Sequence, residues 1–232
     1  MRKLSEEKLK AERERLLKMW EFEDKYSVYS YICGVDEAGR GPLAGPVVAG
    51  ACILDRNEEI LFLNDSKKLS EKRREALFPE IMEKAVAYGI GIAGPELVDE
   101  INILQATYRA MREAVSMCSY MLEKKTGTVS CPELLLNDAV NIPDINIKQI
   151  AIVHGDARSL SIAAASVLAK VTRDKMMLKY DEEYPEYGFA KHKGYGTKQH
   201  IEALKKYGPC LIHRKSFIGH FTDVGGATGA KT

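Results

Sequence analysis

The stretch YICGVDEAGRGPLAGP, residues 31–46, decides how this chain folds. It opens with an apolar run typical of a strand, ends that run in two adjacent carboxylates, Asp36 and Glu37, and continues as a glycine-rich turn. Buried, unpaired carboxylates are rare, and two like charges about 4 Å apart repel by roughly 4 kcal/mol at an effective dielectric of 20. A divalent cation would relieve that repulsion. Glycine has no Cβ, so the backbone N–H groups of Gly39, Arg40 and Gly41 can approach a ligand closely. The pattern indicates metal-assisted chemistry on a phosphate or a sugar.

Further elements follow on both sides of this stretch. Strands are predicted over 31–35, 47–54 and 85–93. Ser70 is a good N-cap for a helix that starts at Glu71, and Pro79 is expected to break or kink that helix. A long amphipathic helix is predicted next, because apolar residues recur at steps of three and four: Ile101, Leu104, Tyr108, Met111, Val115, Cys118 and Leu122.

The second half of the chain alternates strands and helices. Apolar runs at 134–136 and 150–153 predict strands buried on both faces. An alanine-rich helix over 161–175, a polar loop over 188–197 and a helix over 197–207 ended by Gly208-Pro209 are predicted to follow. At the other end, residues 4–24 predict a helix packed on the body through a narrow stripe of Leu9, Leu16, Leu17 and Trp20. A hairpin and meander followed by strand-helix alternation predict an α/β fold, a mixed sheet covered by helices.

Three strand ends therefore supply acidic side chains: Asp36 with Glu37, then Asp138, then Asp156. Ligands of open α/β sheets bind outside such carboxyl ends. Four carboxylates would form an oxygen-only ligand set suited to Mg²⁺ or Mn²⁺, and such a site fits two-metal phosphoryl transfer. Taken singly, an aspartate at a strand end is more often a turn former or a helix cap. Asp156, just before a helix, could be one.

Bulk composition excludes several classes. The 232 residues fit one large domain or one domain with appendages, and no apolar stretch approaches the roughly 20 residues of a membrane span. We expect a cytoplasmic protein. The net charge of +1 gives no global attraction to nucleic acid, so local basic patches would have to bind it. The five cysteines are scattered and predict reduced, buried thiols. The five histidines lack metal or triad spacing and are interpreted as polar surface or loop residues.

The motifs resemble bacterial ribonuclease HII. They are DEAGRGPLAGPVVAGACIL at 36–54, NDSKKLS at 64–70, DEINILQAT at 99–107, LLLNDAV at 134–140, HGDARSLSIAAASVLAKVTRD at 154–174 and GYGT at 194–197. The resemblance implies a ribonuclease H-like fold with a mixed five-stranded sheet and a helical C-terminal segment. It also implies that the four carboxylates are catalytic metal ligands. Two departures from the family pattern are His154, where lysine is commoner, and Asn137, where an aliphatic residue is usual.

The resemblance implies an enzyme that cleaves the RNA strand of RNA/DNA hybrids and cuts 5′ of single ribonucleotides in duplex DNA, as in ribonucleotide excision repair. The products would carry 3′-OH and 5′-phosphate ends. Gly39, Arg40 and Gly41 would bracket the 2′-OH with help from Tyr195, and Ser66 and Lys67 would contact the nucleic-acid backbone. Basic clusters at Lys67-Lys68, 72–74, 191–193 with Lys198, 205–206 and 214–215 would supply sequence-independent affinity.

Alternatives differ in testable features. Ribonuclease HIII has similar carboxylates and an additional N-terminal substrate-binding domain, for which residues 1–28 are too short. A nucleotide-binding module would need a P-loop or a GxGxxG turn, which the sequence lacks. A hybrid-binding protein without turnover would tolerate loss of a carboxylate, and all four are present. We expect an N-terminal helical extension over 1–28, a catalytic domain over 29–222 and a flexible tail over 223–232. The protein would be a monomer whose tail could dock on a sliding clamp.

Overall fold

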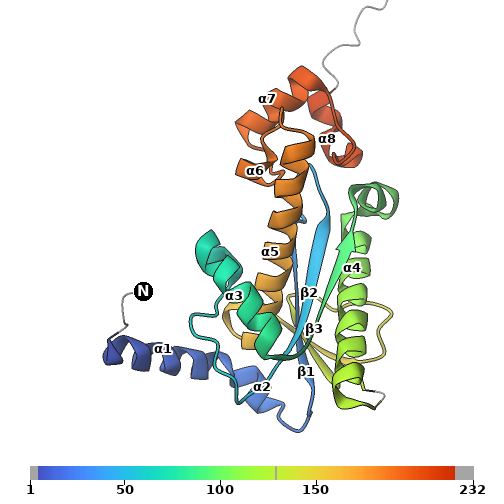
Figure 1. Ribbon diagram of the computed structural model, residues 1–232. Helices are drawn as coiled ribbons and strands as arrows, with labels where there is room; N and C mark the ends of the chain where they lie inside the picture. Colours follow the sequence, from blue (N-terminus) through green and yellow to red (C-terminus); the bar gives the residue numbers. More distant parts are fainter. Residues whose placement is uncertain (1–4, 129, 223–232) are drawn as a thin grey trace, which may run out of the picture.

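A computed structural model describes residues 5–128 and 130–222 of the chain and has a sheet at its centre with helices on both faces (Figure 1). The expected flexible tail at 223–232 lies outside the described residues. The strands are β1 (Ile32–Ala38), β2 (Val47–Leu54), β3 (Ala85–Ala93), β4 (Leu134–Asp138) and β5 (Lys148–Ile152). The helices are α1 (Glu6–Met19), α2 (Glu21–Lys25), α3 (Glu71–Lys84), α4 (Pro95–Thr126), α5 (Leu160–Glu183), α6 (Phe189–His192), α7 (Lys198–Tyr207) and α8 (Lys215–Thr222). Two 3-10 turns, η1 (Ser66–Lys68) and η2 (Gly155–Ala157), lie beside them.

The sheet is mixed and five-stranded, as expected, in the order β3-β2-β1-β4-β5. β1 pairs with β2 and β2 with β3 in antiparallel fashion, whereas β1 with β4 and β4 with β5 are parallel. β4 is buried, but the prediction that the strand near 150 is buried on both faces is wrong. β5 is an edge strand in which Lys148 and Ala151 are exposed. A short apolar run alone does not tell an edge strand from a central one.

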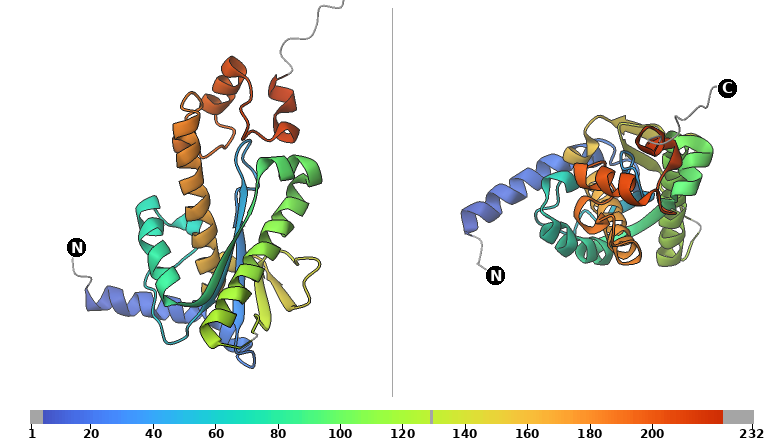
Figure 2. Two further views of the ribbon diagram at one scale, coloured as in Figure 1. Left: turned by 45° about the vertical axis from the view of Figure 1, so that its right-hand side comes forward. Right: turned by 90° about the horizontal axis from the view of Figure 1, so that it is seen from above.

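Helices cover the two faces of the sheet, with α4 on one side and α5 and α3 on the other (Figure 2). α5 lies very close to β1 and β2 because both strands carry a glycine beneath it. A Cβ on Gly34 would lie 2.1 Å from the carbonyl carbon of Ser161, and one on Gly50 would lie 2.3 Å from the carbonyl oxygen of Ala165. A side chain at Gly34 would push α5 away from β1, which carries Asp36, and one at Gly50 would push α5 away from β2.

The C-terminal helices gather at the far end of α5, beyond the edge of the sheet (Figure 1). α5 is longer than predicted, and the segment predicted as a loop over 188–197 contains the short helix α6. Tyr187, Phe189 and Ile212 form a small core of their own with Ala44 and Met177. Ala44 belongs to the turn after β1, so this core fixes the C-terminal helices against the glycine-rich loop.

The predicted N-terminal helix is divided at Trp20 into α1 and α2, and α1 extends away from the body (Figure 2). Leu16, Met19 and Trp20 are buried. Leu17, expected in the buried stripe, is 60% exposed, which corrects that prediction. Leu16 and Leu17 are neighbours on α1, about 100° apart around a helix of 3.6 residues per turn, so the narrow buried stripe includes Leu16 and leaves Leu17 outside.

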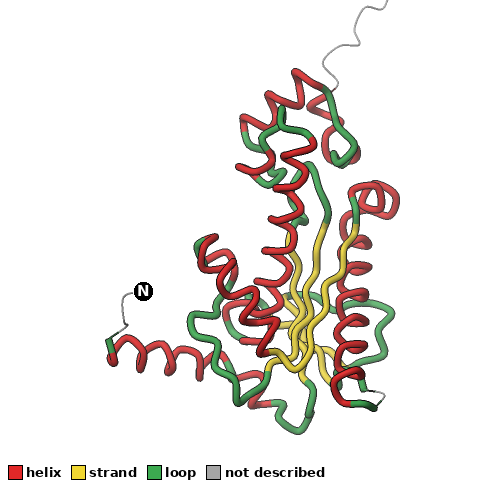
Figure 3. Tube along the Cα trace, in the orientation of Figure 1, coloured by secondary structure: helices red, strands yellow, loops and turns green. Residues whose placement is uncertain are grey.

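Further local expectations concern the helices, drawn in red in Figure 3, and have mixed outcomes. Ser70 caps α3 as predicted, accepting a hydrogen bond from the Arg73 amide at 3.3 Å. Pro79 does not end α3, which continues to Lys84. α4 starts earlier than predicted and is interrupted at Asn102 (φ 68°, ψ 164°).

The predictions about cysteines and about membrane spans, both made from composition, can also be compared with the described residues. Cys33, Cys52 and Cys118 are free, buried thiols, whereas Cys131 is exposed, so the prediction of buried thiols is wrong for Cys131. None of the helices in the described part of the chain is long and apolar enough to cross a membrane.

Candidate active site

Carboxyl ends of the three parallel strands meet at one edge of the sheet. In the parallel register Val35 faces Asn137, which places Asp36 of β1 beside Asp138 of β4, and Asp138 faces Ile152 of β5. Asp156 follows in η2. One carboxylate oxygen from each of Asp36, Asp138 and Asp156 lies within 4.8 Å of the other two. Residues 102 and 120 positions apart along the chain thus share one small volume because strand order places their ends together.

Asp36 carries the largest electrostatic strain of this acidic cluster. Its side chain is 2% exposed. Burial, and next the charges of Glu37 and Asp138, hold the pKa of Asp36 well above its ordinary range. One of its oxygens, Oδ1, accepts a hydrogen bond from the Glu37 amide at 2.7 Å, while Oδ2 is buried and has no hydrogen-bond partner among the described residues. A buried anionic oxygen without a donor is costly. It is the kind of atom that a cation would satisfy.

The chemistry of the donor set fits a divalent metal. The cluster offers only carboxylate oxygens, which suit Mg²⁺ and Mn²⁺. Asp138 is held in place by the Gly155 amide, which donates to its Oδ1 at 2.8 Å. Glu37 does not belong to the 4.8 Å group, and its carboxylate forms a 3.4 Å ion pair with Arg40. Burial is the main cause of the raised pKa of Glu37; Arg40 lowers this pKa and the charge of Asp138 raises it.

Lys67 and Asp65 border the cluster on the side of Asp156. The Lys67 ammonium lies 3.4 Å from Asp156 Oδ2, and the side chain is 71% exposed. Burial would lower the pKa of Lys67, but the charges of Asp36, Asp156 and Asp65 together raise it. Burial, followed by the charges of Asp138 and Asp65, raises the pKa of Asp156. Asp65 was missed by the sequence reasoning, although it stands directly before the Ser66-Lys67 pair in the motif at 64–70.

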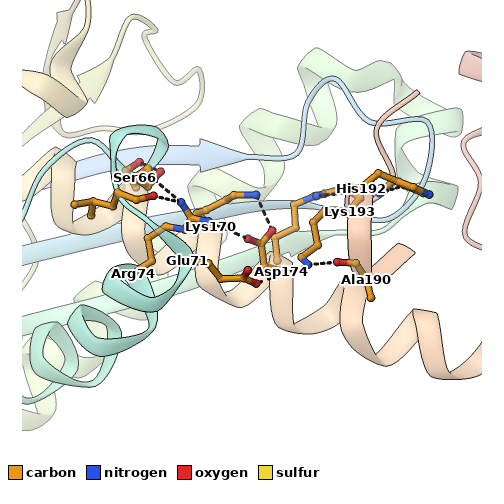
Figure 4. Close-up of polar contacts among 12 residues, drawn as sticks. Ser66, Glu71, Arg74, Lys170, Asp174, Ala190, His192 and Lys193 are labelled. Carbon is orange, nitrogen blue, oxygen red and sulfur yellow. Dashed lines mark hydrogen bonds and ion pairs between the residues drawn. The ribbon is translucent and has the colours of Figure 1, made fainter. Parts of the chain in front are cut away.

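Ser66 lies differently from what its expected role suggests. It is 3% exposed, and its hydroxyl shares a 2.7 Å hydrogen bond with Ser166 of α5. Its carbonyl accepts from Arg74 at 2.9 Å, and Arg74 also faces Asp174, which pairs with Lys170 at 2.7 Å (Figure 4). Arg74 is therefore engaged inside the protein rather than free for phosphate. The network ties η1 to α3 and α5, so the backbone of Ser66 is held rigidly while its hydroxyl faces the interior.

The glycine-rich loop and Tyr195 lie side by side. A Cβ on Gly41 would stand 3.8 Å from Cε1 of the Tyr195 ring. Arg40, Gly41 and Tyr195 are all exposed, and Tyr195 retains 46% of its surface. Gly194 fixes this arrangement, because its carbonyl accepts from the Leu43 amide at 2.8 Å. Segments 150 residues apart thus form one continuous surface.

Three histidines are buried beneath Tyr195, so the prediction that all five lie on the surface or in loops is wrong. His192, His200 and His213 are 7%, 0% and 2% exposed. The Cys210 amide donates to Nδ1 of His213 at 3.0 Å, so the His213 proton is on Nε2, which donates to His200 Nε2 at 3.1 Å. His200 then donates from Nδ1 to the Tyr195 carbonyl at 3.0 Å.

This hydrogen-bond chain requires neutral imidazoles. Burial, followed by the charge of His200, lowers the pKa of His213 to about 4. Burial also lowers the pKa values of His192 and His200. The histidines pack around Phe189, at ring-centroid distances of 5.3 Å for His200 and 5.7 Å for His213. No regular spacing marks such a cluster in the sequence, because the three residues come from α6, α7 and the following loop.

Two further observations address open alternatives. The N-cap of α5 is Ser159, which accepts from the Ile162 amide at 3.2 Å, so Asp156 is not that helix's cap. Asn137, the unusual residue before Asp138, is buried and donates to Gln149 of the neighbouring strand at 2.8 Å. Gln149 in turn bonds both backbone groups of Ile142. Asn137 therefore closes the loop between β4 and β5, whereas His154 is exposed.

Comparisons with known proteins agree with this architecture. The family model for ribonuclease HII matches residues 33–220. The ribonuclease HII of Lachnoclostridium phytofermentans is 59% identical over 94% of this chain and 82% of its own length. The solved ribonuclease H2 from Pyrococcus horikoshii is 26% identical with a TM-score of 0.62, covering 83% of this chain and 99% of its own. A structure titled as the PCNA:RNase HII complex from Archaeoglobus fulgidus is 25% identical with a TM-score of 0.57, covering 81% of this chain and 94% of that one.

Family model, relatives and fold agree, and the buried acidic cluster fits divalent-metal dependence. The chain therefore belongs to the ribonuclease HII family and is a type II ribonuclease H, a metal-dependent hydrolase of RNA/DNA hybrids.

Proposed function

We propose that this ribonuclease H cleaves hybrids, and duplex DNA containing a single ribonucleotide, by two-metal phosphodiester hydrolysis at Asp36, Glu37, Asp138 and Asp156. The observation that carries the proposal is the convergence of three strand-end carboxylates within 4.8 Å around the unpartnered Oδ2 of Asp36. Mg²⁺ or Mn²⁺ bound there would supply an activated water and stabilise the leaving oxygen. The protein's part is to hold the oxygen ligands in place through the sheet register and through the Gly155 amide.

The neighbouring groups support binding of a nucleic-acid strand across this edge. Lys67 is exposed and adjoins Asp156, so it can contact a phosphate without leaving the site. The 2′-OH is the only local group that separates RNA from DNA of the same sequence. Arg40, Gly41 and Tyr195 form the exposed surface where such a group would be read, with the buried Gly39 directly before them. Backbone groups of Gly39, Arg40 and Gly41 would bracket the hydroxyl, and the tyrosine ring would stack on the adjacent sugar. Ser66 would contribute through its backbone.

The polarity of the proposed cut follows the family resemblance. Cleavage on the 5′ side of the ribonucleotide would leave 3′-OH and 5′-phosphate ends, as expected when water attacks the phosphorus and the 3′-oxygen leaves. The fixed order of carboxylates, loop and Tyr195 along one face would set the direction in which a strand binds.

One assay tests this function. A duplex with a single embedded ribonucleotide, an all-RNA/DNA hybrid and an all-DNA duplex of the same sequence are incubated with the protein in EDTA, Mg²⁺ or Mn²⁺. We expect cleavage of the first two substrates only with metal, no cleavage of the DNA duplex, and a cut immediately 5′ of the ribonucleotide. Cleavage of the hybrid without cleavage at the single ribonucleotide would restrict the activity to RNA tracts.

We extend the proposal to domain roles and a protein partner. Residues 29–222 would act as the catalytic domain and residues 1–28 as an appended helical extension. The archaeal relative whose title names a PCNA complex supports a sliding clamp as a partner. Binding of the same organism's clamp, measured by surface plasmon resonance with the full chain and with a chain ending at residue 222, would test both the contact and the role of the tail.

A further inference from the structure

Two arginines beneath the glycine-rich loop form no ion pair with the described residues. Arg173 and Arg214 are 1% and 0% exposed. Within the described residues no carboxylate oxygen lies within 4.0 Å of either guanidinium, and every hydrogen bond that they donate goes to a backbone carbonyl. Buried charges are normally paired. Burial and the neighbouring charge of Arg173 lower the pKa of Arg214 to about 9, which still leaves it a cation at neutral pH.

The carbonyls that these arginines collect belong mostly to the turn between β1 and β2. Arg214 donates to the carbonyls of Gly39 at 2.6 Å, Arg40 at 2.9 Å, Pro42 at 2.9 Å and Gly45 at 2.9 Å. Arg173 donates to the carbonyls of Pro46 at 2.9 Å, Ala44 at 3.1 Å and Lys193 at 3.0 Å. The two side chains thus connect the loop to α5 and to the C-terminal helices.

Because these carbonyls point at the arginines, peptide geometry determines which way the N–H groups of the loop point. In a trans peptide the N–H points away from the C=O of the preceding residue, and the described residues contain no cis peptide. Since the carbonyls of Gly39 and Arg40 point at Arg214, the N–H groups of Arg40 and Gly41 point away from it. Both residues are exposed, and neither amide donates to another described residue.

Gly39 explains why the loop can lie so close to a guanidinium. Its φ is +96°, and a Cβ there would lie 2.1 Å from Nε of Arg173. A side chain at this position would have to displace the arginine. The glycine-rich motif therefore exposes amides on one side and packs closely against the buried arginines on the other.

We propose that Arg214 and Arg173 are positioning residues that aim the Arg40 and Gly41 amides at the bound strand, and that a substrate phosphate supplies the counter-ion they lack. This inference rests on the proposed contact between the loop and the substrate. Two adjacent peptide dipoles with their N–H ends outward and a cation behind them form a donor site for an anionic or hydroxyl oxygen. Nearby Asp99 is engaged elsewhere, accepting from the amides of Lys215 and Ser216 at 2.8 and 2.9 Å.

Binding measured against salt separates the positions of the amides from the charge behind them. Fluorescence anisotropy in EDTA gives the affinity for a ribonucleotide-containing duplex and for a DNA duplex of the same sequence over a range of KCl. Arg214→Lys keeps the charge but cannot donate to four carbonyls, so affinity should fall about tenfold with an unchanged salt slope. Arg214→Gln removes the charge, so the slope should also become shallower by up to about one.

The matched control is Arg112→Gln. Arg112 also donates to a loop carbonyl, that of Pro143 at 3.2 Å, but it lies on α4 and pairs with Asp144 at 3.6 Å. It should keep both the affinity and the slope of the wild type. Near-UV circular dichroism establishes which variants are folded before binding is compared.

Several outcomes would overturn the proposal. A folded Arg214→Gln with wild-type affinity and slope would leave the arginines a purely structural role. If Arg214→Gln does not fold, Arg214→Lys decides alone, because unchanged affinity and cleavage there would mean that the aim of the amides is immaterial. Failure of the proposed function would look different: the wild type would show no preference for the ribonucleotide, while the slope comparison could still be made on the DNA duplex.

Discussion

The acidic cluster and the buried arginines, on the two sides of the glycine-rich loop, carry opposite charges. In each of them a buried charged side chain is left incompletely paired by the described residues. On one side, Asp36 is buried with an oxygen that has no donor among the described residues. On the other, Arg214 is buried with no carboxylate within ion-pair distance in the described chain. Protein interiors normally neutralise such groups internally. Each side therefore suits an external ion: a divalent cation at the acidic cluster and, on our proposal, a substrate phosphate on the outer side of the loop that covers the arginines.

Removing the acidic side should give the largest effect. Asp36→Asn should lower cleavage by about 10³-fold or more, since a metal ligand contributes several kcal/mol to the transition state. Because the pKa of Asp36 is raised in the folded protein, protonated Asp36 favours the folded state at acid pH. That contribution to the free energy of unfolding is lost as the pH rises through the raised pKa. The metal-free variant should therefore melt at the same or a higher temperature than the wild type at neutral pH.

Activity and calorimetric melting curves check this prediction, with Asp144→Asn as control because Asp144 is an exposed loop carboxylate. Near wild-type cleavage by Asp36→Asn or Asp138→Asn would remove the basis for the two-metal site. A large loss of metal-free stability would mean that the cluster is needed for folding instead.

Tyr195 lies beside Gly41 of the loop and should show an intermediate effect. Tyr195→Phe keeps the ring but loses the hydroxyl, so we expect roughly a tenfold loss at a single ribonucleotide. Tyr195→Ala also loses the stack and should cost about 10² or more, because a site that bonds a hydroxyl discriminates strongly against its absence. Rates on the embedded-ribonucleotide duplex measure both, with Tyr120→Ala, an exposed tyrosine on α4, as control. Undiminished rates in both variants would reduce Tyr195 to a loop-packing residue.

Acid should lower the free energy of unfolding through the buried histidines. The pKa of His213 is lowered to about 4, so between that value and its unfolded pKa near 6.5 the unfolded chain binds more protons. The contribution of neutral His213 to the free energy of unfolding is therefore fully present above about pH 6.5 and is lost as the pH falls toward 4. At pH 5 the loss from His213 alone should be about 2 kcal/mol.

Urea unfolding at pH 7 and pH 5 measures this loss. His213→Gln should lose less stability than the wild type between the two pH values, whereas His220→Gln, which changes an exposed histidine of α8, should follow the wild type. An identical acid loss in His213→Gln would assign the effect to other groups.

The smallest effect is expected at Lys67, a cation that lies beside the acidic cluster. Lys67→Ala should weaken binding of duplexes of different sequence several-fold and to a similar degree, and should reduce the salt slope by about one. Its loss also leaves Asp156 without the ammonium 3.4 Å away, so metal affinity should rise slightly. Anisotropy and metal titration measure the two effects, with Lys124→Ala of α4 as control. A sequence-selective loss would indicate that Lys67 contacts bases.

Local pattern was sufficient where the determinant is local. The apolar run before Asp36, the N-cap at Ser70 and the turn residues between β1 and β2 each depend on neighbouring residues, and the structure has a strand, a helix start and a turn there. β1 nevertheless extends to Ala38, so Asp36 and Glu37 lie inside the strand that was predicted to end at residue 35, because both pair with β2. The mixed sheet followed from the hairpin, the meander and the later strand-helix alternation, whereas the order of its strands came only from the structure. The acidic residues were expected at strand ends, where ligands of open α/β sheets bind.

Tertiary structure decided what depends on long-range packing. Whether a strand lies at the edge, as β5 does, depends on which neighbour it lacks. The burial of His192, His200 and His213 depends on how α6, α7 and the next loop enclose Phe189. The role of Arg214 arises from hydrogen bonds to carbonyls about 170 residues earlier, and only the folded backbone determines which way a carbonyl points. The sequence by itself determined the chemical groups and the strand ends that carry them, because composition and period are written in order along the chain. The structure alone determined which of those charges have no partner among the described residues.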